Sequence, residues 1–104
     1  MRRAARVDDN QAEIVAALRL AGCNVQSIAA VGRGCPDIIV GLKERVVLME
    51  IKDGDKVPSA RKLTQDEQAW HDLWADQRRS GAVVVVESVA DARRAMGLAV
   101  AARV

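Results

Sequence analysis

The feature that most constrains the fold is a pair of apolar runs around a short polar turn, in the stretch GCPDIIVGLKERVVLMEIKDG at positions 34–54. Two such runs predict neighbouring antiparallel strands over 37–41 and 45–52. The runs nevertheless carry three charged side chains, Asp37, Glu50 and Lys52, among Val, Ile, Leu and Met. Because an unpaired charge is costly to bury, these three positions need a physical explanation.

The register of this hairpin decides whether the three charges meet. If Lys43 and Glu44 form a two-residue turn, antiparallel pairing sets Asp37 directly opposite Glu50. Side chains alternate along a strand, so Glu50 and Lys52 then point to the same face of the sheet. A slip of one residue would separate the two carboxylates.

Two facing carboxylates repel one another, and a divalent cation between them removes that conflict. A few hard oxygen ligands with room for water favour Mg²⁺ or Mn²⁺ over Zn²⁺. Beside such an ion, Lys52 could orient or help to deprotonate a water, or stabilise charge that develops on phosphorus. The alternative is a hairpin whose edge charges only discourage aggregation. This alternative stays open because the tripeptide Glu-x-Lys alone is common in proteins.

The remaining sequence predicts a single α/β domain. Its 104 residues, of which 50% are hydrophobic, fit one domain spanning 1–104 with a core at about 10–96. The four consecutive valines at 83–86 predict a strand buried on both faces. We expect a central mixed sheet flanked by helices in the order αβββαβα, with helices at 8–21, 64–79 and 89–96, and strands at 24–31, 37–41, 45–52 and 82–87.

Composition excludes several classes of function. Aromatic residues make up 2% of the chain, too few for a surface that stacks single-stranded bases. Cys23 and Cys35 are too few for a disulfide framework or a four-ligand zinc site. The single histidine, His71, excludes histidine-based nuclease sites and is expected on a helix surface. No run approaches about 18 apolar residues, so we expect a cytoplasmic protein without a membrane partner.

Gly-Cys-Pro-Asp at 34–37 followed by Glu-Ile-Lys at 50–52 resembles the PD-(D/E)XK nuclease motif. The stretch 10–92 resembles the VRR-NUC family in its small stand-alone form, of the kind found in phages and prophages of bacteria. The resemblance implies a restriction-endonuclease-like fold and a divalent-metal-dependent DNA endonuclease, often acting on branched structures such as four-way (Holliday) junctions, and a homodimer. It also implies that Asp37, Glu50 and the Ile51 backbone carbonyl bind the metal, and that Lys52 is the catalytic lysine.

Two positions depart from the family pattern. Where the family's second helix bears a Gln, this chain has Glu67, with Gln68 beside it. Helical geometry directs Glu67 toward the sheet and Gln68 toward solvent, so Glu67 is the candidate, as a third carboxylate or a partner for Lys52. The alternative is a first-turn Glu that only favours the helix dipole.

In the first helix, the family's Glu position holds Gln11, and the nearest acid is Glu13. Gln11 faces the same way as the apolar residues of that helix and could hold a water or a phosphate oxygen without adding charge. The replacement leaves the number of bound metal ions open.

Three basic residues are candidate DNA contacts. Arg33 lies between two glycines, and Arg61 and Lys62 precede a predicted helix N-terminus, where a phosphate is favoured. No element resembles a base-reading helix, so we expect recognition of backbone and shape. Two opposed cuts in a junction need two sites, which also predicts a two-fold dimer. The alternatives are a flap or single-strand nuclease, a nickase, or a non-catalytic DNA-binding or assembly module.

Overall fold

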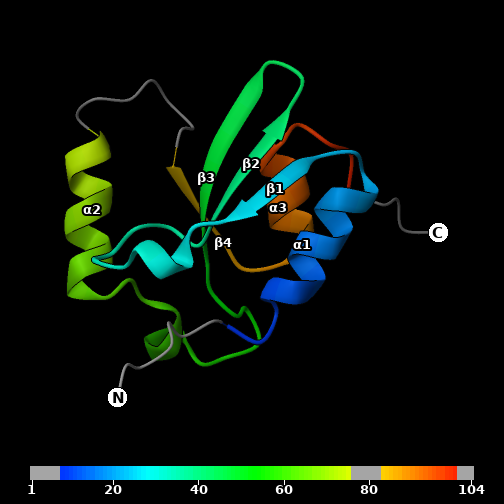
Figure 1. The fold of residues 1–104 in the computed structure, drawn as a ribbon. Helices are drawn as coiled ribbons and strands as arrows, with labels where there is room; N and C mark the ends of the chain where they lie inside the picture. Colours follow the sequence, from blue (N-terminus) through cyan, green and yellow to red (C-terminus); the bar gives the residue numbers. More distant parts are fainter. Residues whose placement is uncertain (1–7, 76–82, 101–104) are drawn as a thin grey trace.

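Four strands and three α-helices form an α/β domain around a mixed sheet (Figure 1), as the sequence predicted. The computed structural model describes residues 8–75 and 83–100. The elements in chain order are α1 (Gln11–Leu20), β1 (Asn24–Ser27), the 3₁₀ turn η1 (Ala29–Val31), β2 (Ile38–Leu42), β3 (Arg45–Ile51), the 3₁₀ turn η2 (Pro58–Arg61), α2 (Gln65–Ala75), β4 (Val83–Val86) and α3 (Val89–Ala95).

The strands lie in the order β1-β2-β3-β4, with the first three antiparallel and β4 parallel to β3. The β2–β3 register pairs Leu42 with Arg45, so the turn comprises residues 43 and 44, as predicted. Lys43 takes a φ of 54°, a left-handed conformation that two-residue hairpin turns require. The register ends at the pair Ile38–Met49. Asp37 comes directly before β2, and its N–H donates to the Met49 carbonyl at 3.0 Å, so direct pairing of Asp37 with Glu50 is not part of the ladder.

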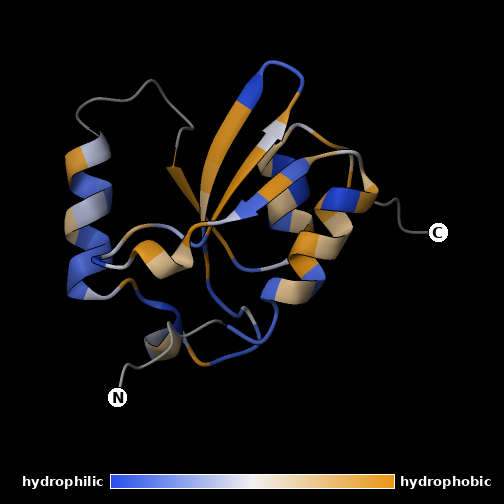
Figure 2. Ribbon diagram, in the orientation of Figure 1, coloured by the Kyte–Doolittle hydropathy of each residue, from blue (hydrophilic) through white to orange (hydrophobic). Residues whose placement is uncertain are grey.

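Helices cover the two faces of the sheet unequally. α1 and α3 pack side by side on one face, and α2 lies on the other (Figure 1). β2, β3 and β4 are mostly apolar up to the polar hairpin turn, whereas β1 is mostly hydrophilic (Figure 2). Burying one large aliphatic side chain stabilises the fold by roughly 1.5–3 kcal/mol. The core between the sheet and the α1–α3 layer contains Ile14, Leu18, Cys23, Ile38, Val40, Val47, Met49, Ile51, Val86, Ala92 and Met96.

This core determines where the charged residues of β3 point. Met49 and Ile51 are 0% and 1% exposed in the α1–α3 layer. Since side chains alternate along a strand, Glu50 and Lys52 face the α2 side. The end of β3 therefore has an apolar face and a charged face.

Two strand predictions were wrong in detail. The strand predicted over 24–31 ends at Ser27, and residues 29–31 form η1, in which the Val31 N–H donates to the Ile28 carbonyl at 3.1 Å. The valine strand is not buried on both faces, because Val85 is 42% exposed. β4 is the last strand of the described sheet, and α2 covers its outer face incompletely.

The inward face of α2 also differs from the prediction. The spacing of apolar residues in this helix predicts an inward stripe of Leu63, Trp70, Leu73 and Trp74. Leu73 and Trp74, however, are 65% and 44% exposed. Glu67 and His71 are half-buried instead, and the His71 Nε2 atom is buried rather than at the helix surface. The predicted continuation of this helix to Arg79 lies outside the described residues. The polar inner face matters because it meets the charged face of β3.

Candidate active site

A cavity of about 460 Å³ opens at the end of the hairpin remote from its turn. It brings together the segment before α1, the ends of β2 and β3, the loop that contains η2, and the first turn of α2. Its lining residues are Asp8, Asp9, Asp37, Glu50, Ile51, Lys52, Lys56, Ser59, Ala60, Lys62, Thr64 and Glu67.

Two carboxylates from neighbouring strands form the floor of the cavity. Glu50 is 2% exposed, and among the residues that the structure describes its Oε1 atom has no hydrogen-bond partner. Asp37 is half-buried, and its Oδ2 atom accepts a hydrogen bond from the Ile51 N–H at 2.7 Å. The backbone of β3 thus fixes the direction of the Asp37 side chain.

Burial and mutual repulsion keep this pair from ionising fully in the metal-free protein. Burial first, and then the nearby Asp37 and Glu67 groups, raise the pKa of Glu50 to about 10. Burial also raises the pKa of Asp37, helped by the charges of Glu67 and Asp8 and opposed by the Ile51 N–H. The pair therefore retains a proton at neutral pH, and binding a divalent cation would release it.

Lys52 adjoins the pair as a buried cation. Its side chain is 10% exposed, and its Nζ atom lies 2.8 Å from Glu67 Oε1 and 4.0 Å from Glu50 Oε2. Burial alone would lower the pKa of Lys52, but the hydrogen bond to Glu67 and the surrounding negative charges raise it above the usual value. The site thus holds Lys52 as an ammonium ion, which can donate to a phosphate oxygen but cannot accept a proton.

Glu67 joins α2 to this site through a single carboxylate. Its Oε1 atom accepts from the Thr64 N–H at 2.8 Å as well as from Lys52, and its own N–H donates to Thr64 Oγ1 at 3.2 Å. This reciprocal pair is a capping box that begins the helix. Gln68 is exposed and bonds to Asp72. Glu67 therefore combines the two roles that the sequence left open, partner of Lys52 and first-turn acid of α2.

Gly34 allows the loop before Asp37 to lie against α2. It has a φ of 83°, and a Cβ atom there would collide with the Asp66 backbone. Only glycine tolerates both conditions. The close approach fixes the first turn of α2, and with it Glu67, beside the strand that carries Asp37.

The donor set of the cavity fits a hard divalent cation. Five carboxylates and three lysines line it, an excess of two negative charges when all are ionised. Glu50, one of these carboxylates, has a buried oxygen without a hydrogen-bond partner in the described ranges. Within residues 8–75 and 83–100, no three His, Cys, Asp or Glu side chains are grouped so that they could hold a metal ion. Two carboxylates with the remaining positions left to backbone oxygen and water suit Mg²⁺, which keeps part of its hydration shell.

The structure does not bring Gln11 into the cavity lining. Gln11 is 8% exposed, and its Oε1 atom is buried without a partner in the described part of the chain. Asp8 and Asp9 approach the cavity from this end of α1 instead. The sequence identified them only as possible helix caps.

The three predicted DNA contacts, Arg33, Arg61 and Lys62, differ in whether they line the cavity and in whether they are paired with a carboxylate. Lys62 lines the cavity and is exposed, whereas Arg33 is exposed outside the lining. Arg61 is engaged by Glu87, with Nη1 and Oε1 3.0 Å apart. Lys56, from the same basic loop as Lys62, also lines the cavity.

Cys35 is a further neighbour of the site that sequence reasoning did not assign to it. Burial, followed by the negative charges of Glu50 and Asp37, raises the pKa of this thiol. Its position two residues before Asp37 is the only sequence signal of this proximity.

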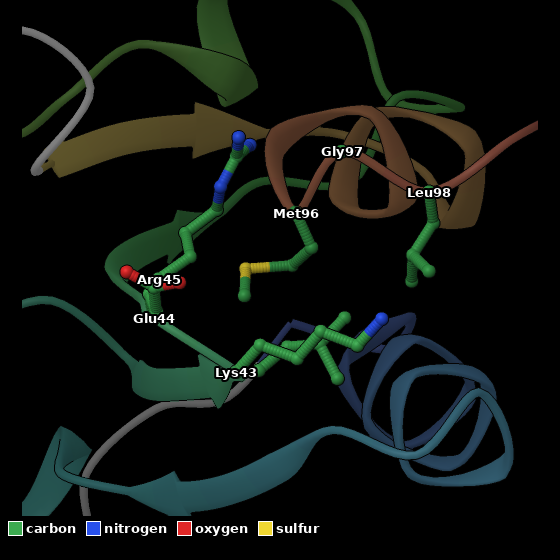
Figure 3. A pocket seen from close by; sticks show the side chains of 7 residues that line it. Lys43, Glu44, Arg45, Met96, Gly97 and Leu98 are labelled. Carbon is green, nitrogen blue, oxygen red and sulfur yellow. The ribbon is translucent and has the colours of Figure 1, made fainter.

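A second cavity of about 460 Å³ lies at the other end of the hairpin (Figure 3). Figure 3 shows the Met96 side chain extending from the end of α3 toward the hairpin turn. Its polar lining consists of the exposed residues Lys43, Glu44 and Arg45, and Arg45 Nη1 donates to the Ala95 carbonyl at 3.1 Å. This cavity has neither the paired carboxylates nor the buried lysine of the first.

A scan against protein-family models found no match for the chain, and searches of curated proteins and of solved structures found none either.

Proposed function

We propose that this protein is a Mg²⁺- or Mn²⁺-dependent DNA endonuclease of restriction-endonuclease-like architecture, related to the VRR-NUC family. The observation that supports this most strongly is the juxtaposition of Asp37, Glu50 and Lys52 on one sheet face, opening into a cavity. The two carboxylates resist ionising together, and the Lys52 ammonium ion lies beside them. This arrangement costs stability, but it is useful in metal-assisted hydrolysis.

Each residue has a specific role in this proposal. Asp37, Glu50 and the backbone carbonyl of Ile51 hold the cation. When bound, a divalent cation supplies charge neutralisation and activates a water for attack on phosphorus. Lys52, kept as an ammonium ion by Glu67, donates to the phosphate and stabilises the negative charge that develops there.

The surroundings of the cavity support DNA as the substrate. Lys56 and Lys62 line the cavity and are exposed, where they can contact phosphates on either side of the scissile bond. No helix in the described ranges is long and apolar enough to cross a membrane. The proposal includes branched DNA, such as a four-way junction, as the substrate. It also includes a homodimer, because paired cuts in a junction with two-fold symmetry require two active sites.

A cleavage assay tests the proposed chemistry. Wild-type protein should cut DNA with Mg²⁺ or Mn²⁺ and stop when EDTA is added. Lys52→Ala should lower the rate by about 100-fold or more, since it removes the charge beside the reacting phosphate. Lys43→Ala, a lysine change on the exposed hairpin turn, is the matched control and should cleave at a near wild-type rate. Equal rates for wild type and Lys52→Ala would defeat the mechanism.

A substrate panel tests the choice of DNA. Junction, flap, nicked and linear duplexes of equal length are compared at one fixed salt concentration, because phosphate contacts make every affinity salt-dependent. The proposal predicts preferential cleavage of the junction. Equal cleavage of all substrates would identify a less selective nuclease, and absence of metal-dependent cleavage would favour a DNA-binding module.

A further inference from the structure

The segment before α1 brings two more carboxylates to the cavity lining, and Asp8 is the less exposed of the two. Asp8 lines the cavity with its side chain 25% exposed, and its Oδ1 atom lies 3.6 Å from the Nζ atom of Lys56. Beyond burial and the closer groups, the charge of Asp8 also raises the pKa values of Asp37 and Lys52. Asp8 is therefore electrostatically coupled to the centre of the site, although it is remote from it in sequence.

The position of Asp8 is fixed by its neighbours. The Asp8 carbonyl accepts from the Gln11 N–H at 3.0 Å, in the first turn of α1. Asn10 has no side-chain capping bond; its Nδ2 atom donates to the Lys52 carbonyl at 3.1 Å and to the Glu87 carbonyl at 3.2 Å. Asn10 thus ties this segment to the residues that follow β3 and β4, and acts as a positioning residue for Asp8.

Two features indicate that this side of the cavity is built to receive a cation. Glu50, whose buried Oε1 atom lacks a partner in the described ranges, lines the same cavity. The Asp8–Lys56 pair is long, and its side chains are 25% and 42% exposed, so it holds little energy and can exchange. The Lys56 ammonium group therefore supplies the positive charge beside Asp8 in the metal-free protein.

We propose that Asp8 adds its negative charge to the cation site through water, from beyond the direct ligands, and that Lys56 neutralises it until Mg²⁺ or Mn²⁺ binds. The inference rests on the proposed function, because it concerns the same cavity. It makes two predictions of opposite sign. Loss of the Asp8 charge weakens cation binding, and loss of the Lys56 charge, which competes with the cation, strengthens it.

The test is a titration of the DNA-free protein with Mg²⁺ and with Mn²⁺. Cation binding is monitored by thermal unfolding and by calorimetry. Asp8→Asn should raise the half-saturating cation concentration by about fivefold to tenfold, and Lys56→Gln should lower it by a similar factor. Glu13→Gln is the matched control: it removes an exposed carboxylate from the first turn of α1, outside the cavity, and should change the concentration by less than about twofold. Asp8→Glu keeps the charge and should retain most of the affinity.

Unfolding in EDTA shows whether each variant is folded before the titration begins. If Asp8→Asn matches Glu13→Gln while Asp37→Asn loses cation binding, the role of Asp8 is wrong and the proposed nuclease site stands. If Lys56→Gln binds the cation no more tightly than wild type, the competition is wrong. If the wild type binds neither cation, both the inference and the metal-dependent function fall.

Discussion

At the scale of single residues, the site is a source of instability in the metal-free protein. Glu50 is almost completely buried, and its nearest neighbours include Asp37, another acid. Apolar residues at these positions would bury more favourably, since a buried carboxylate costs free energy unless it is paired. Retention of charges that destabilise the fold is typical of functional sites.

Replacing Glu50 with Gln should therefore stabilise the metal-free protein. The raised pKa means that folded Glu50 retains a proton which the unfolded chain loses above about pH 4.5. The contribution of Glu50 to stability is thus complete below pH 4.5 and is lost as the pH rises toward about 10. Glu50→Gln should gain about 1–3 kcal/mol in the free energy of unfolding near pH 8, and less near pH 5, by denaturant unfolding in EDTA.

The control for this change is Glu44→Gln, in the exposed hairpin turn, which should alter stability by less than about 0.5 kcal/mol. Added Mg²⁺ should stabilise the wild type and not Glu50→Gln, because only the wild type keeps both carboxylates. A loss of stability in Glu50→Gln across this pH range would show that the pair is not electrostatically strained.

At the scale of the elements, the sequence predicted the hairpin because its register has few solutions. A two-residue turn and the alternation of side chains leave one register, and the structure has it from Leu42–Arg45 to Ile38–Met49. Asp37 departs from it, because its N–H donates to the Met49 carbonyl. Helical geometry likewise predicted the inward direction of Glu67. Both predictions depend on residues close in sequence.

Contacts between distant segments could not be predicted in this way. The sequence offers Asp8, Asp9 or Asn10 as the cap of α1, but the Asn10 side chain bonds to residues 42 and 77 positions away. The same packing places Asp8 at the cavity and leaves Gln11 outside its lining. The incomplete burial of β4 also depends on where α2 lies, which a run of valines cannot show.

Gly34 gives a prediction about how two elements fit together. Gly34→Ala should destabilise the protein through its positive φ and through collision with the Asp66 backbone, and it should lower cleavage by displacing Glu67. Gly32→Ala is the matched control, because Gly32 also has a positive φ but would meet no atom within 4 Å. We expect a loss of about 1–2 kcal/mol for Gly32→Ala and a further 1–3 kcal/mol for Gly34→Ala, by thermal unfolding. Equal losses would show that the close approach is not required.

At the scale of the whole molecule, each chain carries one cavity of the proposed kind in the part that the structure describes. A junction with two-fold symmetry presents two equivalent strands, so paired cuts need two chains related by the same symmetry. The assembly, rather than the single domain, would then determine which DNA shape fits.

Light scattering of the purified protein should consequently give about twice the chain mass of 11.2 kDa. The measurement should be repeated at low and high salt, with and without junction DNA. A monomer that remains a monomer on the junction would remove the paired-cut proposal and leave the nuclease site itself intact.

The most direct test of the central claim is a crystal structure of the protein soaked in Mn²⁺, with anomalous diffraction recorded to locate the ion. The account predicts one anomalous peak between Asp37 and Glu50, about 2.1–2.3 Å from an oxygen of each and close to the Ile51 carbonyl. Lys52 should remain beside Glu67, outside the coordination shell. A fully soaked crystal with no peak between the two carboxylates, or with Mn²⁺ only elsewhere, would contradict the account.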